Sequence, residues 1–176
     1  MKQLGDHVKG PPGADLVLVE YSDFQSPYSA EVVDVIDELL KSFGGKLRFV
    51  FRHFPQPGVH EYALSGALAA EAAARQKKFW AMYRVLFRNQ VALDRETILT
   101  FAEDLDLDLS QFEQDLDSEL TLRRVQRGVL LGEKQGVNRT PTFFINDVKY
   151  EGGTDFESLA GALEDALRGG SKKLVA

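Results

Sequence analysis

The chain has 176 residues, a length typical of one domain with a substantial core. Its net charge is -6 and it has no long run of Lys or Arg, which argues against a nucleic-acid or anionic-membrane surface. No stretch reaches the ~18 apolar residues of a membrane helix, and the polar N-terminal segment lacks the apolar core of a signal peptide. We therefore expect a protein without membrane insertion. As written it would be cytoplasmic, or periplasmic or otherwise extracytoplasmic if a leader or neighbouring domain has been removed.

The first third of the chain predicts a strand–helix–strand unit. Residues 15–20 are an apolar, β-branched run, which is typical of a buried strand. Ser26 and Pro27 suit the cap and the first position of a helix, and a Gly-Gly pair ends that helix after Phe43. Residues 46–53 read as a second strand. Two parallel strands joined by a crossover helix are expected from this order.

The middle of the chain, residues 59–135, is almost wholly helical in pattern. Charged and polar residues alternate with apolar ones at helical spacing, and Asp residues stand where helices should begin. Helices are expected at 63–74, at 78–89, after a cap at Asp94, in a short segment from 108, and at 120–135.

The C-terminal part predicts a hairpin followed by a helix. Residues 142–146 and 148–151 form the two strands around an Asn146-Asp147 turn, and Asp155 caps an amphipathic helix that reaches Arg168. The whole order predicts a single α/β domain over residues 1–176. The predicted architecture is a thioredoxin fold, a central mixed β-sheet flanked by helices, with residues 59–135 as a helical insertion that packs on the sheet.

The tetrapeptide Ser26-Pro27-Tyr28-Ser29 is the most informative motif. It follows a strand, opens a helix, and places two hydroxyls three residues apart on one face of the first turn. With cysteine at both ends it would be a redox centre, because the helix N-terminus lowers the pKa of the first thiol and the second resolves a mixed disulfide. The chain has no cysteine at all. Taken alone, Ser-Pro is also an ordinary helix cap.

Five separated segments along almost the whole chain carry recognisable motifs: 17–29, 51–55, 78–80, 136–146 and 150–152. Together they resemble the DsbA-like branch of the thioredoxin superfamily. The resemblance implies that Ser26 and Ser29 stand where the family carries its redox cysteines, with Pro27 and Tyr28 between them. It therefore implies a thiol–disulfide oxidoreductase fold that is redox-inactive as written.

The same resemblance implies two further site elements. Pro141 resembles the family's cis proline, which would direct the Thr140 backbone outward to pair with an extended peptide or glutathione. Without the resemblance, a trans proline at the start of an edge strand is expected. Glu20 is placed like the family's buried proton carrier, and burial would raise its pKa; the alternative is a strand-end carboxylate in water.

Three interpretations of the serines remain open. In the first, the cysteines of an oxidoreductase were replaced by engineering. In the second, the chain is a natural serine enzyme that resembles the kappa-class glutathione transferases, with Ser26 hydrogen-bonded to the glutathione sulfur. In the third, it is a non-catalytic peptide-binding module. Partners would be cysteine-containing proteins or peptides, or glutathione, and no other cofactor is expected. His7, His53 and His60 show no metal-ligand spacing, so no metal site is expected. All three interpretations predict that Ser26 and Thr140 line one surface groove.

Overall fold

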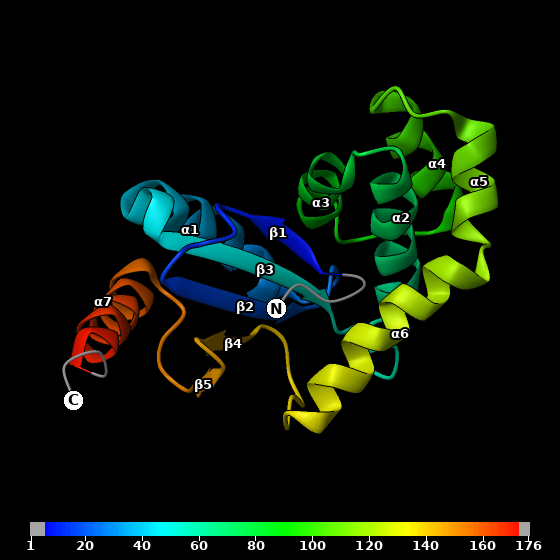
Figure 1. Ribbon diagram of the computed structural model, residues 1–176. Helices are drawn as coiled ribbons and strands as arrows, with labels where there is room; N and C mark the ends of the chain where they lie inside the picture. The colour runs from blue at the N-terminus through cyan, green and yellow to red at the C-terminus, as the bar shows by residue number, and fades with distance from the viewer. Residues whose placement is uncertain (1–5, 173–176) are drawn as a thin grey trace.

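The computed structural model describes residues 6–172, with side chains up to residue 169 (Figure 1). A five-stranded mixed sheet forms its centre, in the order β1-β3-β2-β4-β5. The β2 and β3 strands are parallel, and every other neighbouring pair is antiparallel. The strands are β1 (His7–Lys9), β2 (Leu16–Ser22), β3 (Leu47–His53), β4 (Thr142–Ile145) and β5 (Val148–Tyr150).

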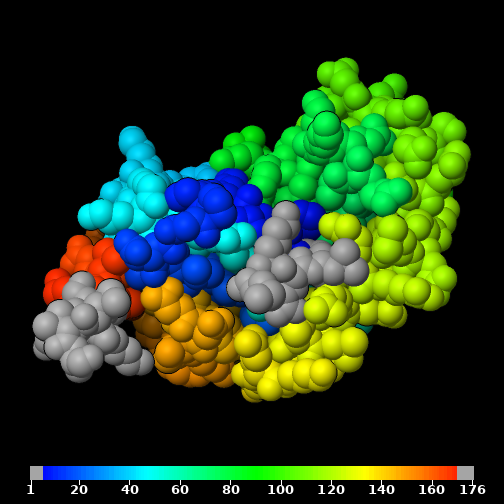
Figure 2. All heavy atoms as spheres, in the orientation of Figure 1, coloured from blue at the N-terminus to red at the C-terminus, as the bar shows by residue number. Residues whose placement is uncertain are grey.

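Helices cover both faces of this sheet. The segment α2–α5 forms a lobe at one end of the sheet, and α6 runs below it, as the ribbon and the space-filling view both show (Figures 1 and 2). Among the described residues no helix is long and apolar enough to cross a membrane. The helices are α1 (Pro27–Phe43), the short 3-10 helix η1 (Gly44–Lys46), α2 (Ala63–Arg75), α3 (Phe79–Arg88), α4 (Arg95–Asp104), α5 (Leu109–Leu116), α6 (Glu119–Lys134) and α7 (Phe156–Lys172).

Two apolar clusters fill the interior. The larger one begins on the sheet face that carries Leu16, Leu18 and Phe49, and continues through α1 and α7 into the helices α2–α5. The smaller one lies on the opposite face, where Val19 and Val50 pack beside side chains of α6. Because one cluster joins the sheet to α2–α5 without a break, the helical segment packs as part of the same body.

The start of α1 is fixed by local chemistry. Ser26 has an extended backbone, and its hydroxyl oxygen accepts a hydrogen bond from the amide of Ser29 at 3.3 Å, while Pro27 occupies the first helical position. The helix ends at Gly44, whose φ of 52° lies in the region that glycine adopts without strain. Side chains at helical spacing, Ser29 among them, face the sheet, so α1 places the Ser-Pro-Tyr-Ser turn at the end of β2.

The predicted elements are present with bounds that differ by one or two residues, and β2, for example, continues to Ser22. Three further differences concern the sheet edge, the hairpin and the last helix. The sequence did not indicate β1, a three-residue edge strand in a polar segment that pairs with distant β3. The first strand of the hairpin ends at Ile145, because Asn146 and Asp147 both have positive φ and form the turn. The last helix runs on to Lys172 rather than ending at Arg168.

Candidate functional site

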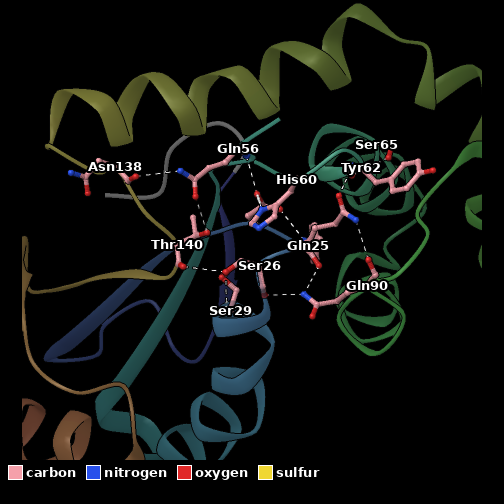
Figure 3. A network of polar contacts seen from close by, with 12 residues as sticks. Gln25, Ser26, Ser29, Gln56, His60, Tyr62, Ser65, Gln90, Asn138 and Thr140 are labelled. Carbon is pink, nitrogen blue, oxygen red and sulfur yellow. Dashed lines mark hydrogen bonds and ion pairs between the residues drawn. The ribbon is translucent and has the colours of Figure 1, made fainter. Parts of the chain in front are cut away.

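The two serines at the start of α1 differ in their environment. Ser26 is 2% exposed, and its hydroxyl donates to the carbonyl oxygen of Thr140 at 3.1 Å while accepting from the Ser29 amide (Figure 3). Ser29 is 0% exposed, and its hydroxyl has no hydrogen-bond partner among the described residues. Between them, Tyr28 is 67% exposed. The helix start therefore presents an aromatic side chain to solvent and keeps both hydroxyls inside.

Thr140 and Pro141 lie directly against this turn. The Thr140–Pro141 peptide bond is cis. The Thr140 carbonyl accepts a hydrogen bond from Ser26, which uses one of its two lone pairs. The Thr140 hydroxyl donates to Oε1 of Gln56 at 3.2 Å, and the amide nitrogen of that glutamine donates to the carbonyl of Asn138 at 3.2 Å (Figure 3). Ser26 and Thr140 are thus in direct contact, with Thr140 only 7% exposed.

Side chains that the sequence did not indicate hold the surrounding loops. Gln90, in the loop after α3, donates to the carbonyl of Ser26 at 2.9 Å. The buried carboxylate of Asp23 lies 2.8 Å from Nδ1 of His60, and it accepts a hydrogen bond from the backbone amide of Gln56 at 2.9 Å. These contacts therefore tie the loop after α3 and the loop after β3 to the segment that leads into α1. No sequence pattern marks such contacts, because an amide side chain can pair with almost any backbone group.

Glu20 lies on β2 under the same helix. Its side chain is on the sheet face of Leu16 and Leu18, which α1 covers, because residues two apart on a strand share a face. The residue is 0% exposed, and neither carboxylate oxygen has a hydrogen-bond partner among the described residues. Burial raises its pKa to about 8, and the nearby Ser22 hydroxyl lowers it by less. The carboxyl therefore holds a proton at neutral pH and does not contact water as a strand-end group would.

A family model described as Thioredoxin matches residues 2–165. The chain belongs to the thioredoxin family. Among curated proteins, a Na(+)/H(+) antiporter NhaA from Herminiimonas arsenicoxydans is 39% identical over 164 residues, which are 93% of this chain and 26% of that protein. An NhaA 3 from Salinispora tropica is 39% identical over 162 residues, 92% of this chain and 25% of that protein. The thioredoxin-family chain thus spans about a quarter of the length of these relatives.

Solved structures of thioredoxin-like oxidoreductases have the same fold. One from Silicibacter pomeroyi DSS-3 is 25% identical with a TM-score of 0.82, covering 97% of this chain and 94% of that one. BdbD from Bacillus subtilis is 22% identical with a TM-score of 0.81, covering 93% and 94%. Alpha-DsbA1 from Wolbachia pipientis is 19% identical with a TM-score of 0.84, covering 99% and 96%. The predicted thioredoxin fold is confirmed, and the resemblance to a DsbA protein is shown at the level of the fold.

A second buried polar cluster lies between the sheet and the helical lobe of this thioredoxin-family chain. Oε1 of Glu71 lies 2.6 Å from Nε2 of His7 and 3.0 Å from Nε2 of His53, and its other oxygen accepts from Nε of Arg124 at 2.6 Å. Burial would raise the pKa of Glu71, but the hydrogen bonds from both histidines lower it well below its usual range. Burial lowers the pKa of His7, against the pull of Glu71.

The structure brings together two of the three histidines, His7 and His53, whose positions in the sequence show no metal-ligand spacing. The donor atoms of His7, His53 and Glu71 all lie within 4.8 Å of one another, a spacing that could hold a metal ion. Each of them is already engaged in a hydrogen bond, however, and Arg124 supplies the positive charge that balances the carboxylate. Both histidines and Arg124 therefore contact the Glu71 carboxylate, which makes this a buried ion-pair cluster centred on Glu71.

Proposed function

We propose that this chain is a DsbA-like disulfide-oxidoreductase domain whose electron-transfer step is removed by the serines at positions 26 and 29. It would bind cysteine-containing polypeptides without oxidising or reducing them. The observation that carries the proposal is the buried, unpartnered hydroxyl of Ser29. A thiol in the same place would lose little, because cysteine behaves as a small hydrophobic residue with a weak donor. Position 29 therefore suits sulfur better than oxygen.

Position 26 supports the same interpretation. Its side-chain atom accepts a hydrogen bond from the Ser29 amide and sits at the N-terminus of a 17-residue helix. Amide donors and the helix dipole both stabilise a negative charge there, which is how a thiol becomes a reactive thiolate. The serine hydroxyl keeps this geometry, but it is hardly ionised at neutral pH.

Glu20 would serve the second thiol. In disulfide exchange the thiolate at position 26 attacks a substrate disulfide, and the thiol at position 29 must then lose its proton to release the product. A buried carboxyl with a pKa of about 8 can exchange protons with such a thiol near neutral pH. In the present chain the group has no thiol to serve.

Substrates would meet the exposed Tyr28 and the loop at Thr140 and Pro141, where an extended peptide could pair with backbone groups. A cysteine-bearing parent would work in an oxidising, extracytoplasmic compartment. A glutathione-binding enzyme that uses Ser26 is the second candidate. For that, the Ser26 hydroxyl, which donates inward to Thr140, would have to turn toward the glutathione sulfur.

The test is gain of activity in the double variant Ser26→Cys/Ser29→Cys. It should catalyse reduction of a protein disulfide such as that of insulin in the presence of a small thiol, whereas the parent chain should not. The matched control Ser26→Cys/Ser29→Ala should form mixed disulfides and fail to turn over, because it lacks the resolving thiol. A folded double variant that shows no exchange would refute the proposal. Saturable binding of glutathione to the parent chain, lost in Ser26→Ala, would favour the transferase-like candidate instead.

A further inference from the structure

Buried polar atoms without partners gather in one region of the molecule. Among the described residues, such atoms belong to the side chains of five residues, and four of these lie on the α1 side of the sheet or in the first turn of α1. The set consists of Glu20, Ser22, Ser29, Arg48 and His53. Native proteins pair nearly all buried polar groups, so a cluster of this kind needs an explanation.

Three members of this set are neighbours on the sheet. Glu20 and Ser22 are two residues apart on β2 and share its face. The parallel register pairs Ser22 with His53, and Glu20 with Phe51. The ring of Phe51 lies 5.2 Å from that of His53, on the same face. The side chains of Glu20, Ser22 and His53 therefore lie on one face of two adjoining strands, with Ser22 directly opposite His53.

The bonding of His53 fixes which of its nitrogens is open. Nε2 lies 3.0 Å from a Glu71 oxygen, and an ionised carboxylate only accepts hydrogen bonds, so Nε2 carries the proton. In the neutral ring, Nδ1 then bears a lone pair that is buried and unpartnered among the described residues. The protonated Glu20 carboxyl and the Ser22 hydroxyl are both donors. The region thus contains donors and an acceptor that match one another.

We propose that Glu20, Ser22 and Nδ1 of His53 bind an internal water molecule and form a proton path between the carboxyl and the imidazole. A buried water usually makes two to four hydrogen bonds to such otherwise unsatisfied groups. The path makes His53 the proton partner of Glu20, a role that rests on the proposed function, since Glu20 would there exchange protons with a thiol at position 29.

The proton balance is simple. A proton leaves the Glu20 O–H through the water and Ser22 and arrives at Nδ1 of His53, which keeps its Nε2 proton and becomes a cation. Glu71 holds that cation, and Arg124 stays on the other Glu71 oxygen. Other titratable groups face the pair: Tyr83 of α3 interacts electrostatically with Glu20, and His7 of β1 does so with His53. Reversal of the same steps returns the proton to Glu20.

Nuclear magnetic resonance on the parent chain tests this path without any thiol. The ¹³C signal of the Glu20 carboxyl should titrate near pH 8, and the ¹⁵N signal of His53 Nδ1 should respond to the ionisation of Glu20. Glu20→Gln should remove that response from His53, and Ser22→Ala should weaken it. The control Ser65→Ala, which removes a hydroxyl on α2 that bonds to Leu93, should leave it unchanged. High-resolution diffraction should show ordered solvent between Ser22 and His53.

A His53 signal that ignores the titration of Glu20, or close apolar packing between these side chains without ordered solvent, would overturn the proton path. These results are separable from the test of the proposed function. If the double cysteine variant fails to exchange disulfides while the Glu20–His53 coupling is present, the proposed function is wrong and the path stands. If exchange is restored without coupling, the path is wrong and the proposed function stands.

Discussion

Removing the two hydroxyls of the Ser-Pro-Tyr-Ser turn one at a time should change stability in opposite directions. The Ser29 hydroxyl is buried and unpartnered among the described residues, and an unpaired buried hydroxyl costs about 1–3 kcal/mol. Ser29→Ala removes that cost, keeps the backbone amide that bonds to Ser26, and adds a few tenths of a kcal/mol of helix propensity. Loss of the oxygen's packing offsets part of this gain. The variant should be more stable than the parent by about 1 kcal/mol.

The matched variant Ser26→Ala should be less stable than the parent. It loses the cap of α1 and the hydrogen bond to the Thr140 carbonyl, for a combined loss of about 1–3 kcal/mol. Urea unfolding followed by circular dichroism measures both free energies, and a thermal scan should show melting temperatures about 2–4 °C apart for each kcal/mol. A Ser29→Ala variant that is less stable than the parent would refute the reasoning, because it would show that the hydroxyl is well bonded.

The remaining predictions concern stability elsewhere in the core. Burial raises the pKa of Glu20 from 4.5 to about 8, so between these pH values the folded state keeps a proton that the unfolded state has lost. The free energy of unfolding should therefore fall as the pH rises from 4.5 to 8, by up to about 1.4 kcal/mol per pH unit. Urea titrations at several pH values should show this fall in the parent chain and a flatter dependence in Glu20→Gln. Asp6→Ala leaves the buried guanidinium of Arg52 without its two hydrogen bonds to Asp6, of 2.8 and 3.2 Å. The free energy of unfolding should fall by about 3–5 kcal/mol in the same assay, and a fall below about 1 kcal/mol would contradict this expectation. Gly128→Ala places a Cβ 2.3 Å from the His53 carbonyl oxygen and should lower the free energy of unfolding by about 3 kcal/mol. Gly161→Ala, on α7, meets open space and should raise that free energy by up to about 1 kcal/mol. Equal effects of the two substitutions would count against the packing described for α6.

Features that depend on neighbouring residues in the chain could be predicted from the sequence. Asp94 and Asp108 cap α4 and α5 as expected, each accepting from the amide three residues on at 2.9 Å. The Ser-Pro pair at the start of α1 and the Asn-Asp turn belong to the same kind of signal. In each case, the residue that fixes the structure lies within one turn of the group that it satisfies.

Features that depend on distant residues could not be predicted. The His7–Glu71 contact joins residues 64 positions apart, and the contact between Gln56 and Thr140 joins residues 84 apart. Neither contact has a periodic pattern, because the first arises only when β1 packs against α2 and the second only when the loop after β3 meets the segment before β4. The position of Glu20 is intermediate: a carboxylate in an apolar strand indicates burial, but its proton-holding state follows from the packing of α1 above it.

The central claim is that the site lacks only its two sulfur atoms. Incubating Ser26→Cys/Ser29→Cys in a glutathione redox buffer and mapping its peptides by mass spectrometry tests this most directly. We expect one disulfide between positions 26 and 29, and a first thiol that alkylates faster at neutral pH than an ordinary cysteine. Two thiols that stay reduced in oxidising buffer, in a variant that folds like the parent, would contradict it.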